Sequence, residues 1–316
     1  MIRRRLVGAN LEPPRLHYGE WFWEGEWGMK VLEQKVEMRY RPAQSHLELM
    51  DVDTLEVTHV RAYNYLIEAP NWLPDDRLLY NSGGRIYILD PKTGTETQVD
   101  TGFCTRCNND HVVWKDRLAV SCFTAEDMLS RVYTLPLSGG TPTLVTPMGH
   151  SFLHGISPDG TALAYCAERN GSWDIYSIPF AGGEEARLTD SEGLNDGPEY
   201  APDGRIWFNS VRDGNMQVYR MNADGTEQTR MTRDGRNDWF PHVSPDGKRV
   251  VYISYDGGVK PGDHPANKNV ALFIMDADGM NGRLLRKLFG GQGTINVNAW
   301  ASDSRRIAYV RYGEVD

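Results

Sequence analysis

The stretch HGISPDGTALAYCAERNGSWDIYSIPFAGGEEARLT, residues 154–189, decides the fold class of this chain. It holds two apolar runs, LAYC and DIYSI, separated by turns rich in Gly, Asp and Asn. Short apolar runs bounded by such turns are typical of β-strands. The order is strand, Pro-Asp-Gly turn, apolar strand, loop, alternating strand, glycine turn and short polar strand. The stretch therefore predicts one four-stranded antiparallel unit.

The same unit recurs along the chain. Clear copies are PEYAPDGRIWFNSVRDGNMQVYRMNADGTEQTRMT (198–232) and PHVSPDGKRVVYISY (241–255), which continues in VALFIMDADGMNGRLL (270–285). Weaker copies begin at Ala69 and His111, and a half-copy spans 298–312. One acid marks the first turn of each copy, at intervals of 41, 43, 44, 43 and 57 residues: Asp75, Asp116, Asp159, Asp203, Asp246 and Asp303. Four strands every 40–45 residues or so is the pattern of propeller blades, and six turn acids predict six blades.

The last copy ends after two strands, and the strands it lacks are expected at the front of the chain, in HLELMDVDTLEVTHV (46–60). We therefore predict an all-β, six-bladed propeller over residues 45–316, closed by an N-terminal hairpin that completes the C-terminal blade. Closure of this kind removes exposed strand edges. Residues 1–44 form an N-terminal appendage in this scheme. Met29 offers an alternative start, which would place residues 1–28 outside the natural protein.

The phrases SPDG…AYCAERNG…DIY…GGEEARLT and APDGRIWFNS…YRMNADGTEQTRMT resemble the TolB-type β-propeller repeats over nearly all of the chain past residue 60. Related blades occur in prolyl-oligopeptidase propeller domains and in oligogalacturonate lyases. The resemblance implies a fold and leaves the activity open. A peptidase would need a hydrolase domain with a GxSxG motif, for which no residues remain. The metal-binding Gln-x-x-His-x-His run of the lyases has no counterpart, since Gly235, Asp238 and Phe240 stand there.

Composition excludes two classes of partner. The chain has 34 Lys and Arg against 43 Asp and Glu, a net charge of −9, which gives no electrostatic basis for binding nucleic acid or an anionic membrane. No apolar run is long enough for a membrane helix, and the N-terminus lacks a secretory h-region, so a cytoplasmic location is expected. No GxGxxG motif is present, and we expect no nucleotide cofactor.

The unusual polar residues fall on one face of the predicted propeller. In a four-stranded blade, the loops between strands 2 and 3 lie on the same side as the links between blades. The predicted catalytic residues are His111, His154, His242, Asp110, Asp196 and Asp238. The predicted substrate-binding residues are Arg106, Asn108, Asn109, Asn195, Asn237, Asn267, Lys268 and Asn296. The insertion KPGDHPANKN (260–269) is placed on this face as a wall or lid.

Imidazoles beside carboxylates suit a divalent cation such as Mn, Ca or Zn. The predicted metal ligands are His111, His154, His242 and His264. Taken with the lyase resemblance, the set favours an enzyme, a lyase or hydrolase, that acts on an oligosaccharide or sugar acid. The alternative is a non-catalytic propeller that binds a peptide or small ligand as a scaffold for a protein partner. For each residue taken alone, a structural role such as capping a turn is the competing explanation.

Overall fold

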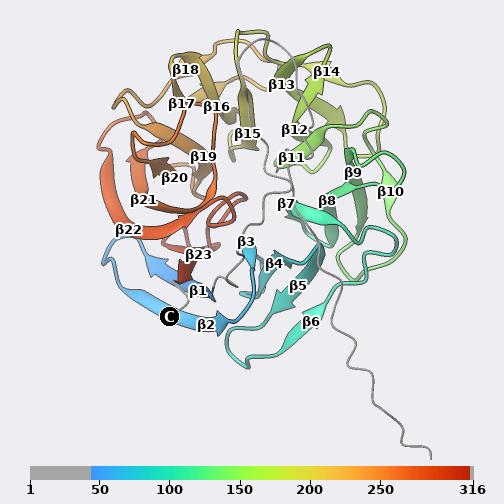
Figure 1. Cartoon of the computed structure of the whole chain (residues 1–316), viewed down its shortest axis with the longest axis horizontal. Helices are drawn as coiled ribbons and strands as arrows, with labels where there is room; N and C mark the ends of the chain where they lie inside the picture. The colour runs from blue at the N-terminus through green and yellow to red at the C-terminus, as the bar shows by residue number, and fades with distance from the viewer. Residues whose placement is uncertain (1–43, 314–316) are drawn as a thin grey trace, which may run out of the picture. The chain divides into compact units, whose positions relative to one another are not determined.

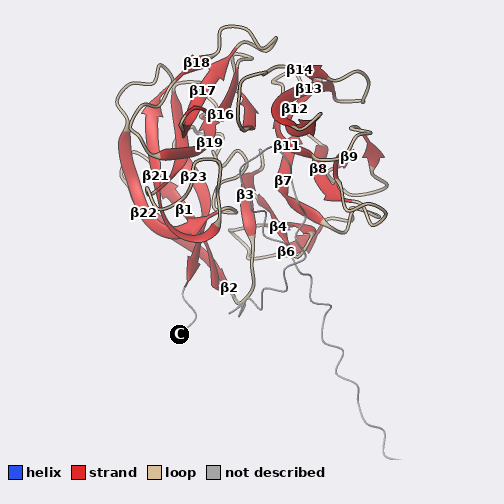
Figure 2. Cartoon of the chain, turned by 45° about the horizontal axis from the view of Figure 1, so that its top comes forward, coloured by secondary structure: helices blue, strands red, loops and turns tan. Residues whose placement is uncertain are grey.

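The computed structural model describes residues 44–313, and the predicted appendage at 1–44 lies almost wholly outside them. The described residues form strands β1 to β23, joined by turns and loops (Figures 1 and 2). No helix in this part of the chain is long and apolar enough to cross a membrane. The strands pair into six antiparallel sheets, which are the six blades predicted from the turn acids.

The first three blades follow one another along the chain. Blade 1 contains β3 (Glu68–Trp72), β4 (Leu78–Ser82), β5 (Arg85–Leu89) and β6 (Glu96–Gln98). Blade 2 contains β7 (Cys107–Trp114), β8 (Arg117–Phe123), β9 (Ser130–Pro136) and β10 (Thr143–Leu144). Blade 3 contains β11 (Ser151–Ile156), β12 (Ala162–Arg169), β13 (Ser172–Pro179) and β14 (Ala186–Arg187).

The remaining blades complete the ring. Blade 4 contains β15 (Asn195–Tyr200), β16 (Ile206–Asp213), β17 (Asn215–Met221) and β18 (Thr229–Arg230). Blade 5 contains β19 (Asn237–Val243), β20 (Arg249–Tyr255), β21 (Ala266–Asp276) and β22 (Arg283–Gly291). Blade 6 combines β23 (Arg306–Gly313) with β1 (Gln44–Asp51) and β2 (Val57–Tyr63), and a bridge from Trp300 to Ile307 marks its inner edge.

The N-terminal hairpin closes the ring as predicted. β1 lies between β2 and β23 and pairs with β23 from Gln44↔Gly313 to Asp51↔Arg306. Glu48, at the centre of this seam, is buried; it accepts a hydrogen bond from the hydroxyl of Tyr309 (2.8 Å) and pairs with Arg286 (2.9 Å). The first and last segments of the propeller are therefore joined by a ladder and by a buried carboxylate.

The turn acids act as turn formers. Asp159 accepts hydrogen bonds from the backbone N–H and the hydroxyl of Thr161, at 3.0 and 2.7 Å. Asp75, Asp203, Asp246 and Asp303 likewise accept from the backbone N–H two residues on. A carboxylate that bonds its own backbone two residues ahead stabilises a tight turn. This local chemistry explains the repeat that the sequence displays.

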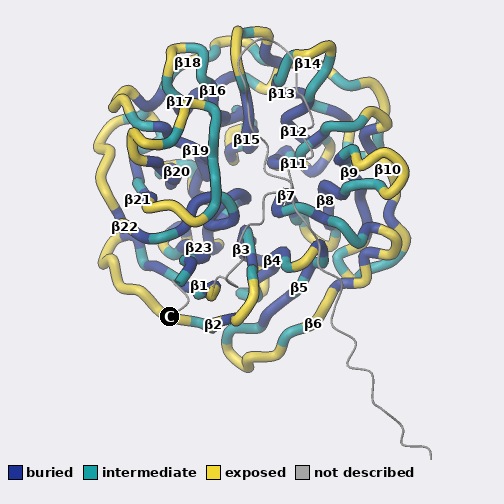
Figure 3. Tube along the Cα trace, viewed as in Figure 1, coloured by how far each residue is buried: buried dark blue, intermediate teal, exposed yellow. Residues whose placement is uncertain are grey.

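The core lies between the blades. Six clusters of buried apolar side chains are described, five of which draw on two neighbouring blades and one on three; the cluster between blades 1 and 2, for example, includes Leu79, Ile86, Leu118 and Val120. Burial is greatest along the inner and middle strands and least in the outer turns (Figure 3). Apolar faces on both sides of each sheet account for the near-continuous hydrophobic runs of the second strands.

The inner strands of blades 1 to 5 each contain a β-bulge, a few residues before the turn acid of the blade. The register shifts between Glu68 and Asn71, Cys107 and His111, Leu153 and Gly155, Asp196 and Glu199, and Trp239 and His242. In blades 1, 4 and 5 the residue before a proline takes positive φ: Ala69, Gly197 and Phe240. A bulge re-aims the side chains on either side of it. The polar residues at these bulges form the candidate site.

The insertion is partly strand. The loop between β20 and β21 covers residues 256–265, and β21 begins at Ala266. Asn267 and Lys268, which we expected in a loop over the site, lie on β21 and are exposed. The extra residues therefore lengthen the β21–β22 hairpin as well as supplying His264 from the loop.

Candidate functional site

Four titratable side chains meet where the inner strands begin. Nε2 of His154, on β11, lies 3.3 Å from Oδ1 of Asp196 on β15 and 3.9 Å from Oδ1 of Asp110 on β7. Nε2 of His264, from the β20–β21 loop, lies 3.8 Å from Oδ2 of Asp196. We call Asp110, His154, Asp196 and His264 the acid–histidine cluster. Figure 1 shows β7, β11 and β15 side by side around the centre of the ring.

Backbone and amide groups hold the two carboxylates in place. The Gly197 N–H donates to Oδ1 of Asp196 at 2.7 Å, and the Asn108 amide donates to Oδ2 of Asp110 at 2.5 Å. Oδ1 of Asn108 in turn accepts from the backbone N–H of Asp110 at 3.1 Å. On the other side of the ring of His154, Nδ1 lies 3.4 Å from the backbone oxygen of Asn296. The cluster is thus fixed by neighbours from blades 2, 4 and 6.

Burial and neighbouring charges shift the pKa values of the cluster residues in different directions. Burial lowers the pKa of His154, but the charges of Asp110 and Asp196 outweigh it and raise that pKa to about 9. Burial raises the pKa of Asp110 to about 6, and the nearby charge of Asp196 adds to the effect. Asp196 faces burial too, yet its hydrogen bond with His154 lowers its pKa. The shorter contact explains why His154 stabilises the charge of Asp196 more than that of Asp110.

Aromatic rings cover one side of the two histidines. The ring of Phe240 stacks on His154, with centroids 5.7 Å apart. Trp239 meets the ring of His264 edge-on at 4.4 Å, and burial lowers the pKa of His264. Both aromatic residues come from the bulge of β19, so the irregular inner strand of blade 5 supplies an apolar wall to a charged cluster.

Glu68 is a site residue that our sequence reasoning missed. It lies at the bulge of β3, accepts a hydrogen bond from the Asn109 amide at 3.4 Å, and has its pKa raised to about 7 by burial and by the charge of Asp110. The signal was in the repeat: Glu68-Ala-Pro precedes Asp75 by the same interval at which Asp196-Gly-Pro precedes Asp203.

His242 bonds to residues other than the four of the cluster, and both of its ring nitrogens are occupied. Nδ1 lies 2.5 Å from Oε2 of Glu199, and Nε2 contacts the backbone oxygen of Ile295. Oε1 of Glu199 also accepts from the Val243 N–H at 3.1 Å and from the Asn298 amide at 2.8 Å. This network ties β15 and β19 to blade 6. The arrangement favours a positioning role for His242.

Two other predicted catalytic residues, His111 and Asp238, are buried and do not take part in the ion pairs of the acid–histidine cluster. His111 is fully buried, and burial lowers its pKa to about 4, so its ring is neutral around pH 7. Asp238 lies opposite Ser254 in the β19–β20 ladder, and burial together with the charge of Asp234 raises its pKa to about 7. Their roles as catalytic groups stay predictions.

The predicted substrate-binding residues divide into three groups. Asn108, Asn109 and Asn296 touch the cluster or Glu68. Asn195 and Asn237 are buried and bond to other partners: the Asn195 amide donates to Asp174 on β13 (3.1 Å), and the Asn237 amide donates to the backbone oxygen of Val259 in the β20–β21 loop (2.8 Å). Arg106, Asn267 and Lys268 lie elsewhere, and the side chain of Arg106 contacts the sulfur of Met128.

The cluster does not fit a resident metal. Among residues 44–313, no group of three or more His, Cys, Asp or Glu side chains is arranged to hold one. The two carboxylates raise the pKa of His154 to about 9, so a cation bound by this imidazole would have to displace its proton. We therefore describe the chemistry of the site without a metal.

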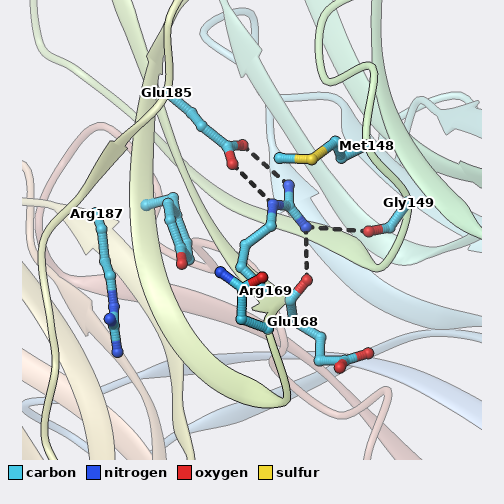
Figure 4. Close-up of a pocket in the computed structure, with 8 residues that line it drawn as sticks. Met148, Gly149, Glu168, Arg169, Glu185 and Arg187 are labelled. Carbon is cyan, nitrogen blue, oxygen red and sulfur yellow. Dashed lines mark hydrogen bonds and ion pairs between the residues drawn. The ribbon is translucent and has the colours of Figure 1, made fainter.

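A separate pocket of about 420 Å³ lies on blade 3 (Figure 4). Arg169 crosses it and pairs with Glu185 at 2.7 Å, while its Nη1 donates to the backbone oxygens of Gly149 and Glu168. Arg187 on its far side pairs with Asp174 at 2.6 Å. Because these charges satisfy one another, the pocket has less claim to a ligand than the acid–histidine cluster.

Comparison with known proteins points to one family. A sequence model of the TolB β-propeller domain matches residues 115–262. The chain is 46% identical over 279 residues to the uncharacterised protein Atu1656 of Agrobacterium fabrum strain C58, covering 86% of this chain and 94% of that protein.

Solved structures agree with this match. A protein of Agrobacterium tumefaciens, provisionally named TolB, superposes with a TM-score of 0.83 at 45% identity, over 86% of this chain and 99% of that one. TolB of Acinetobacter baumannii superposes with a TM-score of 0.62 at 22% identity, over 79% of this chain and 65% of that one. The second similarity concerns the fold alone.

Proposed function

We propose that this chain, which belongs to the TolB β-propeller family, binds a small polar ligand at the acid–histidine cluster. The observation that carries the proposal is the meeting of two carboxylates and two imidazoles, from three inner strands and one loop, within 3.3 to 3.9 Å. Burying such groups costs free energy that packing of the ring does not require. Convergent polar groups with shifted pKa values beside an apolar wall are typical of ligand sites.

The charge of the site limits the ligand. Glu68, Asp110 and Asp196 supply three carboxyl groups, whereas one imidazole, His154, has a pKa of about 9. This excess of acid favours ligands that donate hydrogen bonds or carry an ammonium or guanidinium group, and disfavours a ligand carboxylate. Trp239 and Phe240 are buried and back the two histidines with an apolar wall. An amino sugar, a neutral oligosaccharide or a basic peptide side chain meets these conditions.

Three oligosaccharides of equal length test the proposal by calorimetry: an amino-sugar oligomer, its N-acetylated neutral form and an oligogalacturonate. We expect affinity to fall in that order, and we expect Asp196→Asn to weaken binding of the amino sugar by about tenfold or more. The matched control is Asp224→Asn, an exposed turn carboxylate between β17 and β18. Tightest binding of the acidic oligomer, unchanged in Asp196→Asn, would contradict the proposal.

A second candidate is the enzyme predicted from the sequence, a lyase or hydrolase acting on an oligosaccharide or sugar acid. The observation that favours it is the pair Glu68 and Asp110, whose pKa values are raised to about 7 and about 6 and whose charges interact. Carboxyl groups poised near neutral pH can give and take protons in turn. His154 would then hold developing negative charge.

Turnover separates the two candidates. Product formation from any of the three oligosaccharides, lost in Glu68→Gln while binding persists, would support an enzyme. Binding without product, in the presence and absence of added Mn²⁺ or Ca²⁺, would support a binding propeller that presents its ligand or a protein partner. Addition of EDTA should leave binding unchanged in either case, because the cluster holds its own charges.

A further inference from the structure

Three of the four cysteines meet between blades 1 and 2, away from the acid–histidine cluster. Cys104, Cys107 and Cys122 belong to one apolar cluster, with exposed fractions of 0%, 0% and 3%. All are free thiols. Cys107 on β7 lies directly opposite Cys122 on β8, and Cys104 precedes β7 by one short turn. The fourth thiol, Cys166, lies in blade 3 and donates to the backbone oxygen of Asn195.

The ladder places Cys107 and Cys122 at the spacing of a disulfide. The Phe123 N–H donates to the backbone oxygen of Arg106 at 3.1 Å. This bond joins the residues on either side of the cysteines, so Cys107 and Cys122 form a non-hydrogen-bonded antiparallel pair. Cα atoms in such a pair lie about 4.5 Å apart, and disulfides span Cα distances of about 4.4–6.8 Å. The bond can therefore form without a shift of the strands.

The Cys122 sulfur interacts with both of the other thiols. Hydrogen bonds with the thiols of Cys104 and Cys107 lower the pKa of Cys122, and the charge of Arg106 adds to this, against the opposing effect of burial. The pKa values of Cys104 and Cys107 are raised by the same hydrogen bonds and by burial. A thiolate, not a thiol, is the nucleophile in sulfur chemistry. One thiolate with two thiol neighbours is the arrangement of a nucleophile beside resolving cysteines.

We propose that Cys107 and Cys122 form a reversible disulfide when the protein meets hydrogen peroxide. The Cys122 sulfur attacks one peroxide oxygen, the O–O bond breaks, and the leaving hydroxide takes a proton to become water. The Cys107 sulfur then attacks the sulfenic sulfur of Cys122, the S–O bond breaks, and the second oxygen leaves as water with the Cys107 proton. Two thiols lose two electrons, and one peroxide becomes two waters.

The proposed bond lies close to the candidate site along the chain. Cys107 is followed by Asn108, whose amide holds Asp110 of the acid–histidine cluster. Cys107 also bonds through its N–H to the backbone of Gly84, in the β4–β5 turn of blade 1. A cross-link here ties the start of β7 to β8, at the end from which the site residues extend.

Peptide mapping of the natural protein tests the proposal without a variant. Trypsin cleaves after Arg85, Lys92, Arg106, Lys115, Arg117 and Arg131, which puts the three thiols on separate peptides: 93–106, 107–115 and 118–131. After mild peroxide treatment of the folded protein and alkylation of free thiols, we expect a 107–115/118–131 cross-linked species. It should disappear after dithiothreitol. A cross-link of 93–106 to either partner, or no cross-link, would overturn the proposal.

Cys166 is the matched internal control. It is as buried as Cys122, with 1% exposure, but has no thiol partner among the cysteines described here. If global unfolding exposed the thiols, Cys166 would be oxidised at the same rate. We expect it to stay fully alkylatable while the cross-link forms. Cys104→Ser should keep the cross-link and Cys122→Ser should lose it, with circular dichroism confirming that each variant is folded.

Discussion

Nε2 of His154 lies 3.3 Å from Oδ1 of Asp196 and joins the inner strands of blades 3 and 4. The two residues are 42 positions apart in the sequence, about one repeat, yet they occupy different repeat positions: His154 stands five residues before its turn acid and Asp196 seven. Both lie at the register shift of their strand. The pair is therefore a product of the bulges. The shifted pKa values of both residues make the stability of the protein depend on pH.

The stability of the protein should fall in alkaline solution. The pKa of His154 rises from 6.5 to about 9 on folding, so its contribution is fully present below pH 6.5 and is lost as the pH rises through 9. The shift corresponds to about 3 kcal/mol at most. Urea unfolding between pH 6.5 and 9.5 measures it. His154→Gln should flatten the decline over this range, and an equally steep decline in that variant would refute the assignment.

Removal of either carboxylate, that of Asp196 or that of Asp110, should lower the pKa of His154. In Asp196→Asn, the His154 ring loses its closest charged partner, while burial continues to lower its pKa. We therefore expect the pKa of His154 to fall. Titration of the His154 ring protons by nuclear magnetic resonance measures the change. Asp110→Asn should produce a smaller decrease, because Asp110 lies 3.9 Å away rather than 3.3 Å. Equal effects from both substitutions would mean that the ring lies midway between the two acids.

The architecture could be predicted from the sequence because each blade is specified by turn residues and apolar runs that lie close together along the chain. Asp159 and four of its equivalents form turns through bonds to residues two positions on, and strand burial follows the apolar runs. The closing hairpin was predictable for a related reason, since strands 46–60 were the only unassigned pair that could complete the last blade.

The site was predicted less well because it depends on bulges. Strand counting placed His111, His154 and His242 at one mouth, but the register shifts direct His154 into the cluster, while the nitrogens of His242 bond Glu199 and Ile295. Glu68 was missed because it stands in a weak repeat copy, where its equivalence to Asp196 shows only in the seven-residue interval to the turn acid. A bulge depends on contacts between blades that a single sequence does not display.

The closing seam should be weakened by loss of its buried acid. Glu48→Ala would leave the Tyr309 hydroxyl without its acceptor and separate Arg286 from its partner at 2.9 Å. The guanidinium groups of Arg286 and of Arg311, which also pairs with Glu48, are partly exposed. We therefore expect the free energy of unfolding to fall by about 1–3 kcal/mol, chiefly because the Tyr309 hydroxyl loses its acceptor. Urea unfolding measures it. Glu56→Ala, at an exposed position between the two strands of the same hairpin, should change stability by less than about 0.5 kcal/mol.

The bulge of blade 4 should depend on glycine at position 197. Gly197 has φ of +59°, and an added Cβ would lie 2.9 Å from Nδ2 of Asn209 and 3.1 Å from the ring of Phe240. Gly197→Ala should therefore destabilise the protein and move Asp196 away from His154. The control is Gly83→Ala, at φ of +55° with no atom within 4 Å of the added Cβ, which isolates the backbone cost of about 1 kcal/mol. Thermal unfolding of both variants, with ligand affinity for Gly197→Ala, measures the difference. Equal losses in the two variants would show that the contacts of Gly197 with Asn209 and Phe240 do not position the site.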